Sequence, residues 1–166
     1  AQVDDAGNIY VADKDAHAVR KIDRNGILTT LAGTNEPGDD GDEPAFATNV
    51  HLNQPNGLWV SPDGTVYVLD LGNAKVRRID VDGTMTTLFT WAELTIGRGL
   101  WVSDDGARAL LSSQPTLVEW TQGGAHVIAD SFSNLSNLFV EETAVVVTER
   151  SPGTVSRIGE NGLPAR

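Results

Sequence analysis

Residues 54–70, QPNGLWVSPDGTVYVLD, contain an Asn-Gly turn, a short apolar run, a Pro-Asp-Gly turn and an alternating β-branched and aromatic run that ends in Asp. This order predicts two β-strands joined by a tight hairpin. Imperfect copies occur at 2–13 (QVDDAGNIYVAD), 98–106 (RGLWVSDDG) and 136–142 (SNLFVEE). The chain is therefore expected to consist of four repeats of one unit.

Each repeat continues beyond this hairpin. In the first repeat a polar connection leads to a segment with two β-branched residues at 19–23 (VRKID), an Asn-Gly turn at 25–26 and a segment rich in β-branched residues at 27–32 (ILTTLA). Such segments predict a third and a fourth strand, so each repeat is expected to form a four-stranded antiparallel meander.

The repeat period predicts how the meanders assemble. Aligning the repeats on Leu58, Leu100 and Leu138 gives spacings of about 42 and 38 residues, which are typical of β-propeller blades. One twisted meander has two apolar faces and cannot bury both alone, so the copies are expected to stack radially. The predicted fold is all-β, a single β-propeller domain of about four blades at 1–34, 57–90, 99–130 and 137–166.

Composition limits the function classes. The 166 residues are enough for one substantial core. A formal net charge of −11 would repel phosphate backbones, so a nucleic-acid partner is not expected. The absence of cysteine excludes disulfides and thiolate metal sites. No apolar run is long enough to span a bilayer, so membrane insertion is not expected.

One long interruption, 35–56, separates the first two blades. Its second half places Phe46, Val50 and Leu52 at a spacing that predicts a single helical turn. Its first half carries carboxylates next to glycines at 38 and 41 that would let them fold back on one centre. This cluster is a weak calcium candidate, and an ordinary solvated acidic loop has the same composition. It consists of Asp39, Asp40, Asp42 and Glu43.

In a propeller, the segments that lead into the innermost strands surround the central channel on one face. Here that face would carry Asn56, Arg98 and Ser136 at equivalent positions. An alternative interpretation is that Asn56 only forms a turn with Gly57. The connections between second and third strands lie beside these segments. They add the binding candidates Lys14, Asp15, His17, Leu71, Gly72, Asn73, Lys75, Gln114, Thr116, Arg150 and Ser151, and Trp91 between two blades is a candidate contact residue.

Catalytic signals are absent from the sequence. It has no cysteine, no Gly-x-Ser-x-Gly and no phosphate-binding Gly-rich loop, and its three histidines are scattered. No catalytic residue or cofactor is therefore assigned. The sequence favours a protein that is not an enzyme.

The first repeat resembles the NHL repeat as bacterial proteins carry it. The resemblance rests on 5–13 (DAGNIYVAD), 19–23 (VRKID), Asn25-Gly26 and 29–34 (TTLAGT), and it is strongest over 1–90. It implies a six-bladed propeller outside the cytoplasm, secreted or periplasmic, that presents loops to another protein or a ligand. Compared with a six-bladed propeller, the chain is short. We expect a fragment whose remaining blades belong to a longer chain, or copies that associate edge to edge to close the ring.

A weaker similarity links Asn56-Gly57-Leu58 to the segment of gluconolactonase-like six-bladed enzymes where an Asn binds a divalent metal. Arg98 and Ser136 at equivalent positions supply a permanent cation and a weak neutral oxygen, which argues against a channel metal built from these blades. Two functions follow from the sequence. The first is a non-catalytic scaffold that binds a protein or small ligand, and the alternative is part of a metal-dependent propeller lactonase, esterase or lyase.

Overall fold

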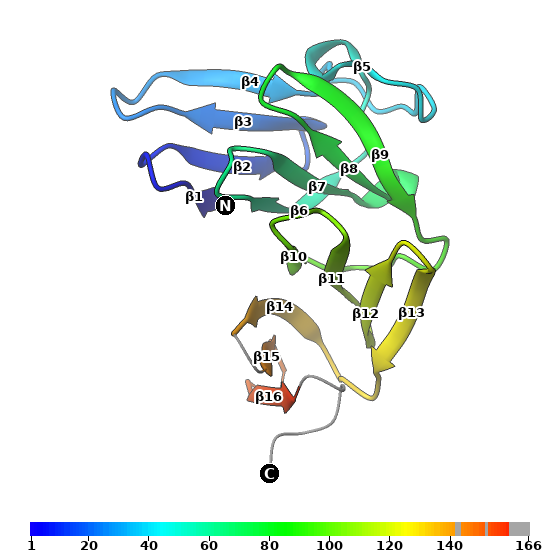
Figure 1. Cartoon of the computed structure of the whole chain (residues 1–166). Helices are drawn as coiled ribbons and strands as arrows, with labels where there is room; N and C mark the ends of the chain where they lie inside the picture. The colour runs from blue at the N-terminus through cyan, green and yellow to red at the C-terminus, as the bar shows by residue number, and fades with distance from the viewer. Residues whose placement is uncertain (142–143, 152, 160–166) are drawn as a thin grey trace. The chain divides into compact units, whose positions relative to one another are not determined.

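The computed structural model describes residues 1–141, 144–151 and 153–159. The first repeat forms a four-stranded antiparallel meander in sequence order (Figure 1). Its strands are β1 (Gln2–Val3), β2 (Ile9–Asp13), β3 (Ala18–Ile22) and β4 (Leu28–Ala32).

The second repeat forms a meander with one added strand. Its own strands are β6 (Pro55–Val60), β7 (Val66–Asp70), β8 (Lys75–Ile79) and β9 (Thr84–Thr90), with the single-turn 3-10 helix η2 (Leu71–Asn73) after β7. The interruption before this repeat contributes β5 (Ala45–Phe46), which pairs with β9 and makes a five-stranded sheet. Gly64 in the β6–β7 turn has φ +91°, a conformation that glycine adopts without strain.

The third and fourth repeats form two further antiparallel sheets. The third contains β10 (Leu100–Val102), β11 (Arg108–Ser113), β12 (Thr116–Thr121) and β13 (Gly124–Ala129). The fourth contains β14 (Leu135–Val140), β15 (Ala144–Glu149) and β16 (Val155–Gly159). The fourth strand predicted for this repeat lies outside the described residues.

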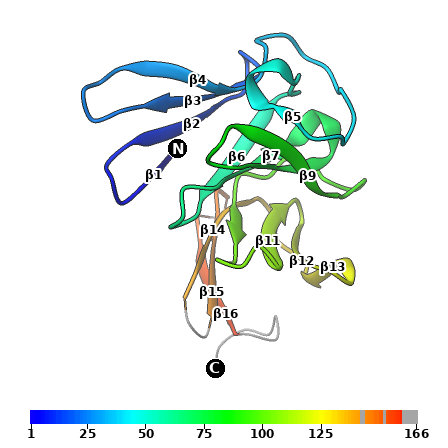
Figure 2. The same ribbon diagram turned by 45° about the horizontal axis from the view of Figure 1, so that its top comes forward.

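The chain forms two compact units, which are described separately: unit 1 is Ala1–Ala92 and unit 2 begins at Glu93. Figure 2 shows the two meanders of unit 1 as separate twisted sheets. Between them lies a core that includes Tyr10, Val19, Leu58 and Val68. The core of unit 2 joins its two meanders through residues such as Leu110, Leu117, Leu135 and Val147.

The interruption before the second repeat covers part of the unit 1 core. A 3-10 turn, η1 (Ala47–Asn49), lies where a helical turn was predicted, and Val50 and Leu52 are buried. Phe46, which was grouped with Val50 and Leu52 in the predicted turn, belongs instead to the edge strand β5 before η1 and is 65% exposed.

The described residues contain no α-helix, since their only helical segments are η1 and η2. None of their helices is long and apolar enough to cross a membrane.

Candidate functional site

A repeated hydrogen bond holds the segments that lead into the innermost strands. In three repeats the last residue of the second strand accepts a backbone N–H from the lead-in segment of its own repeat. The pairs are Asp70 Oδ1 with Asn53 (2.7 Å), Ser113 Oγ with Thr95 (3.0 Å) and Glu149 Oε1 with Ser133 (2.7 Å). The Asp that ends the sequence motif therefore has a structural role, and Ser and Glu replace it as acceptors.

The third repeat holds its lead-in segment with a second serine. Ser112 is fully buried, and its Oγ accepts the N–H groups of Arg98 (3.0 Å) and Gly99 (2.9 Å). The backbone that carries the Arg98 side chain is thereby fixed to β11. Ser112 was not among the predicted site residues. The available signal was the polar pair Ser112-Ser113 at the end of an otherwise apolar strand, where the second repeat has Leu69-Asp70.

Replacing Ser112 with alanine is expected to lower the free energy of unfolding by about 2 kcal/mol, because two buried N–H groups lose their acceptor. Urea unfolding followed by circular dichroism measures this change. Ser133→Ala is the matched control, since the Ser133 side chain is exposed and only its backbone N–H is hydrogen-bonded. The free energy of unfolding of this control should stay within about 0.5 kcal/mol of the wild-type value. Equal stability of the two variants would contradict the role assigned to Ser112.

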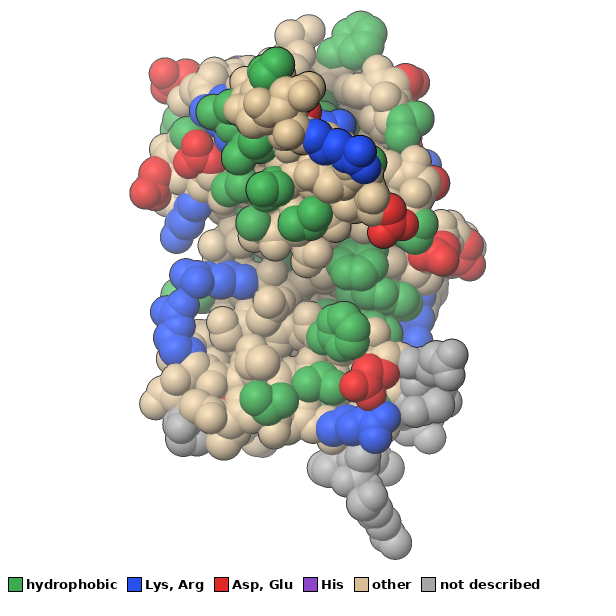
Figure 3. Space-filling model, turned by 90° about the vertical axis from the view of Figure 1, so that its left-hand side faces the viewer, with side chains coloured by type: hydrophobic (Ala, Val, Ile, Leu, Met, Phe, Trp, Pro, Cys, Tyr) green, Lys and Arg blue, Asp and Glu red, His purple; other side chains and the backbone are tan. Residues whose placement is uncertain are grey.

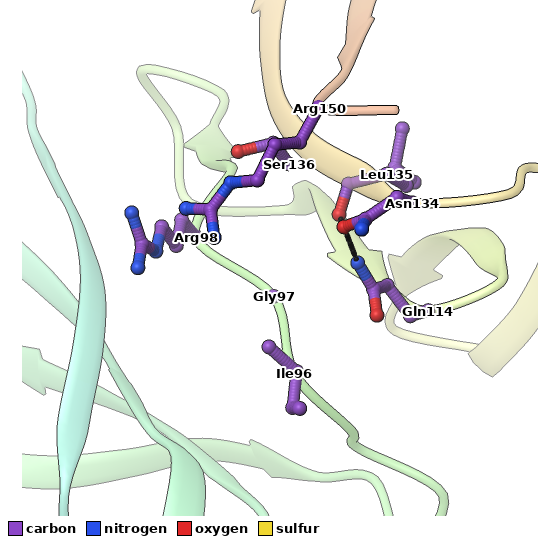
Figure 4. A pocket seen from close by; sticks show the side chains of 8 residues that line it. All are labelled: Ile96, Gly97, Arg98, Gln114, Asn134, Leu135, Ser136 and Arg150. Carbon is purple, nitrogen blue, oxygen red and sulfur yellow. Dashed lines mark hydrogen bonds between the residues drawn. The ribbon is translucent and has the colours of Figure 1, made fainter. Parts of the chain in front are cut away.

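A pocket in unit 2 brings together four residues predicted from the repeat alignment (Figure 4). Arg98 and Ser136 occupy one repeat position, two residues before the aligned leucines. Gln114 and Arg150 occupy another, directly after β11 and β15. The pocket has an empty volume of about 240 Å³, open solvent included. Its remaining lining residues are Ile96, Gly97, Asn134 and Leu135.

The pocket has an amide side and a guanidinium side. On the amide side Gln114 Nε2 donates to Asn134 Oδ1 (2.6 Å) and to the Leu135 carbonyl (3.1 Å), which ties the two repeats together. On the other side the exposed Arg98 and Arg150 side chains extend in the same direction, beside Ser136 (Figure 4). The arrangement presents several N–H donors to whatever occupies the pocket.

These two arginines differ from the other arginines in the described part of the chain. Neither Arg98 nor Arg150 has a carboxylate or carbonyl partner for its guanidinium among the described residues, and the pocket lining contains no Asp or Glu. On one face of the molecule, Figure 3 shows a group of Lys and Arg side chains with no acidic side chain against it. The other described arginines each have an acceptor: Arg20 (Asp13), Arg24 (Ala6 carbonyl), Arg77 (Gly41 carbonyl), Arg78 (Asp80), Arg108 (Glu119) and Arg157 (Glu141).

Apart from Thr116 and Ser151, which belong to unit 2, the remaining predicted lead-in and connection residues belong to unit 1. Asn56 lies half-buried in β6, and Lys14 is exposed in the β2–β3 connection. His17 has a left-handed backbone (φ 50°), and its Nδ1 accepts the Gln54 N–H at 3.1 Å. The His17 ring therefore connects the first meander to the segment that leads into the second.

Asn73 and Lys75 hold the interruption against the second meander. Asn73 Nδ2 donates to the Gly38 carbonyl (2.8 Å) and to Asp70 Oδ2 (2.9 Å). The Lys75 ammonium is buried and forms ion pairs with Asp39 (2.7 Å) and Asp42 (3.0 Å). The structure thus gives both side chains internal partners.

The acidic cluster is engaged by other side chains of the protein itself. The hydrogen bond from Lys75 holds the pKa of Asp39 below its usual value, and Asp40 contacts His51 Nδ1 at 2.8 Å. Glu43 is exposed. Within the described residues no group of three or more His, Asp or Glu side chains is arranged to hold a metal ion. Calcium binding by the cluster stays a prediction, for which Lys75 is a competing cation.

Two further side chains have unusual surroundings. Trp91 is half-buried, and its Nε1–H is buried without a hydrogen-bond partner among the described residues. Asp70 is fully buried, and this burial raises the pKa of its carboxyl to about 6 despite the hydrogen bonds from Asn53 and Asn73. Asp70 therefore titrates near neutrality.

Comparison with solved structures identifies the architecture. The chain superposes on a gluconolactonase from Xanthomonas campestris with a TM-score of 0.71, at 19% identity over 98% of this chain and 58% of that one. The chain has a β-propeller fold. This propeller is also similar to virginiamycin B lyase from Staphylococcus aureus (TM-score 0.67, 19% identity, 96% of this chain and 51% of that one) and to a chain of a nidogen/laminin complex (0.68, 15%, 92% and 55%). These likenesses confirm the predicted fold class and show the fold alone.

Sequence comparison covers less of the propeller. No family model matches it. Teneurin-3 from Danio rerio is 34% identical over 86 residues, which are 45% of this chain and 3% of that protein. Teneurin-4 from Homo sapiens is 27% identical over 164 residues, 84% of this chain and 6% of that protein. The chain thus spans a small part of these relatives and about half of its structural neighbours.

Proposed function

We propose that this chain is part of an NHL-like propeller that acts as a non-catalytic binding module, presenting its lead-in segments to a protein or small-ligand partner. The observation that carries the proposal is the pocket of unit 2, where two repeat positions bring Arg98, Ser136, Gln114 and Arg150 together. Side chains that vary between repeats at positions with a fixed backbone are suited to recognition. Further blades, from a longer chain or a second copy, would complete the ring.

The comparisons support a binding role without specifying it. One structural neighbour is part of a nidogen/laminin complex, so a propeller of this kind assembles with another protein there. We also propose that the protein is located outside the cytoplasm. The likeness to the nidogen/laminin structure and the resemblance to bacterial NHL repeats support this location.

A fragment screen by protein NMR tests the binding role. A set of small neutral, anionic and cationic compounds is added to the labelled chain, and shifted amide signals are mapped. We expect saturable shifts to concentrate on Gly97–Gly99 and Leu135–Ser136, while the hairpin turns at Gly26 and Gly83, at the opposite ends of their strands, remain unchanged. Shifts confined to the hairpin turns, or no saturable shift, would contradict the proposal.

The alternative function is part of a metal-dependent propeller enzyme. It is favoured by the fold shared with a gluconolactonase and a lyase, and by Asn56 at the lead-in position of the second repeat. Elemental analysis of the full-length protein distinguishes the two. A stoichiometric divalent metal whose removal abolishes lactone hydrolysis would replace the binding role with the enzymatic one.

A further inference from the structure

We infer that Arg98 and Arg150 form a two-arginine site for a small oxyanion, the carboxylate or phosphate group of a ligand. This inference rests on the proposed binding role of the unit 2 pocket and names the chemical class that the pocket recognises. It starts from an imbalance of charge. In a chain with a formal net charge of −11, two guanidinium groups line one pocket whose lining contains no carboxylate.

The imbalance is local and specific to this pocket. Each of the other six arginines in the described ranges has a carboxylate or carbonyl acceptor. The carboxylate next to Arg150 in the chain is engaged elsewhere, since Glu149 accepts the Ser133 N–H (2.7 Å) and the Thr154 hydroxyl (2.8 Å). Two like charges on one pocket repel each other, and a bound anion would remove that repulsion.

The donors suit an oxyanion in number and in geometry. A guanidinium presents its N–H groups as a planar fork that matches carboxylate or phosphate oxygens two at a time. The Ser136 hydroxyl lies beside the two arginines and has no hydrogen-bond partner among the residues that the structure describes (Figure 4). The backbone N–H groups of Arg98 and Gly99 donate to Ser112 Oγ, which fixes the backbone from which the Arg98 side chain extends. A side chain carried by a fixed backbone loses less entropy on binding than one carried by a mobile loop.

The size of the pocket and the charge of the chain limit the ligand further. The pocket is small, because its empty volume of about 240 Å³ includes open solvent, and this size suits one carboxylate or phosphate group. The acidic chain as a whole repels anions at long range, so affinity must come from contact with the two arginines. A polyanion such as nucleic acid is not expected to bind.

Titration at constant ionic strength tests the inference. The probes are citrate for the carboxylate group, inorganic phosphate for the phosphate group, and glycerol as an uncharged comparator, each added to the labelled chain and followed by NMR. We expect citrate or phosphate to shift the Nε–H signals of Arg98 and Arg150 saturably, with the tighter probe identifying the group. Arg98→Gln and Arg150→Gln should each weaken binding about tenfold, because each removes a charge-assisted pair of hydrogen bonds.

Arg157→Gln is the matched control. Arg157 belongs to the same unit, is exposed and pairs with Glu141 at 2.8 Å, and it does not line the pocket. Its removal changes the net charge by the same amount and should leave the affinity within about twofold. Equal weakening by all three variants would indicate non-specific attraction and overturn the inference. Binding of uncharged fragments to the pocket without binding of citrate or phosphate would also overturn it while leaving the proposed binding role intact.

Discussion

The wild-type chain is expected to gain stability relative to Asp70→Asn when the pH falls from 7 to 4, by about 2 to 3 kcal/mol. Burial raises the pKa of Asp70 to about 6 in the folded chain, above the ordinary value of 3.8. Between pH 3.8 and about pH 6 the folded state therefore binds more protons than the unfolded state. The contribution of Asp70 is therefore fully present below pH 3.8 and is lost as the pH rises through 6. Urea unfolding of both proteins at several pH values measures the difference.

Comparing the two proteins at each pH cancels the other carboxylates. Asp39 and Asp42, whose pKa values are lowered by hydrogen bonds with Lys75 and Thr87 respectively, lose their contribution as the pH falls, and they do so in both chains. Asp23→Asn is a control in which the stability difference from the wild type should change with pH in the opposite direction. The reason is that the hydrogen bond from the Ile27 N–H lowers the pKa of Asp23. A difference between wild type and Asp70→Asn that is flat from pH 7 to pH 4 would show that Asp70 is ionised throughout.

The propeller fold was predictable because its signals are local. Turn glycines, β-branched runs and a period near 40 residues each report on short stretches of chain, and the repeats reinforce one another. The same repeat register placed side chains of the third and fourth repeats on one predicted face, within a longer set of candidates, and did not single out the four that share a pocket. Arg98 and Ser136 share one repeat position, Gln114 and Arg150 share another, and all four line one pocket. That they bind a ligand stays a prediction.

The contacts of the irregular segment were not predictable from pattern. Lys75 was grouped with the binding candidates because it follows the second strand, yet its ammonium pairs with Asp39, 36 residues earlier in the chain. Asn73 likewise reaches the Gly38 carbonyl, 35 residues away. The path of residues 35–54 depends on long-range packing, which periodicity does not report. The acidic cluster could therefore be recognised from the sequence, whereas its cation partner could not.

Replacing Gly97 with alanine is expected to cause the largest loss at the unit 2 pocket, about 3 kcal/mol or more of unfolding free energy together with loss of citrate or phosphate binding. A Cβ at Gly97 would lie 1.7 Å from the carbonyl oxygen and 2.7 Å from the carbonyl carbon of Ser112. Backbone atoms of β11 cannot yield as a side chain can. The lead-in segment must shift, and the shift separates the Arg98 and Gly99 N–H groups from Ser112 Oγ.

Gly123→Ala makes the same chemical change without the steric conflict, because its Cβ would lie 3.6 Å from the nearest atom, Thr121 Oγ1. It should keep the stability within about 0.5 kcal/mol and leave anion binding unchanged. Amide spectra separate the two effects in Gly97→Ala. If the damage is confined to the pocket, the amide signals of β12 and β13 stay at their wild-type positions. The Arg98 and Arg150 Nε–H signals then no longer respond to citrate or phosphate. Wild-type stability and binding in Gly97→Ala would instead show that the lead-in segment does not depend on its close approach to β11.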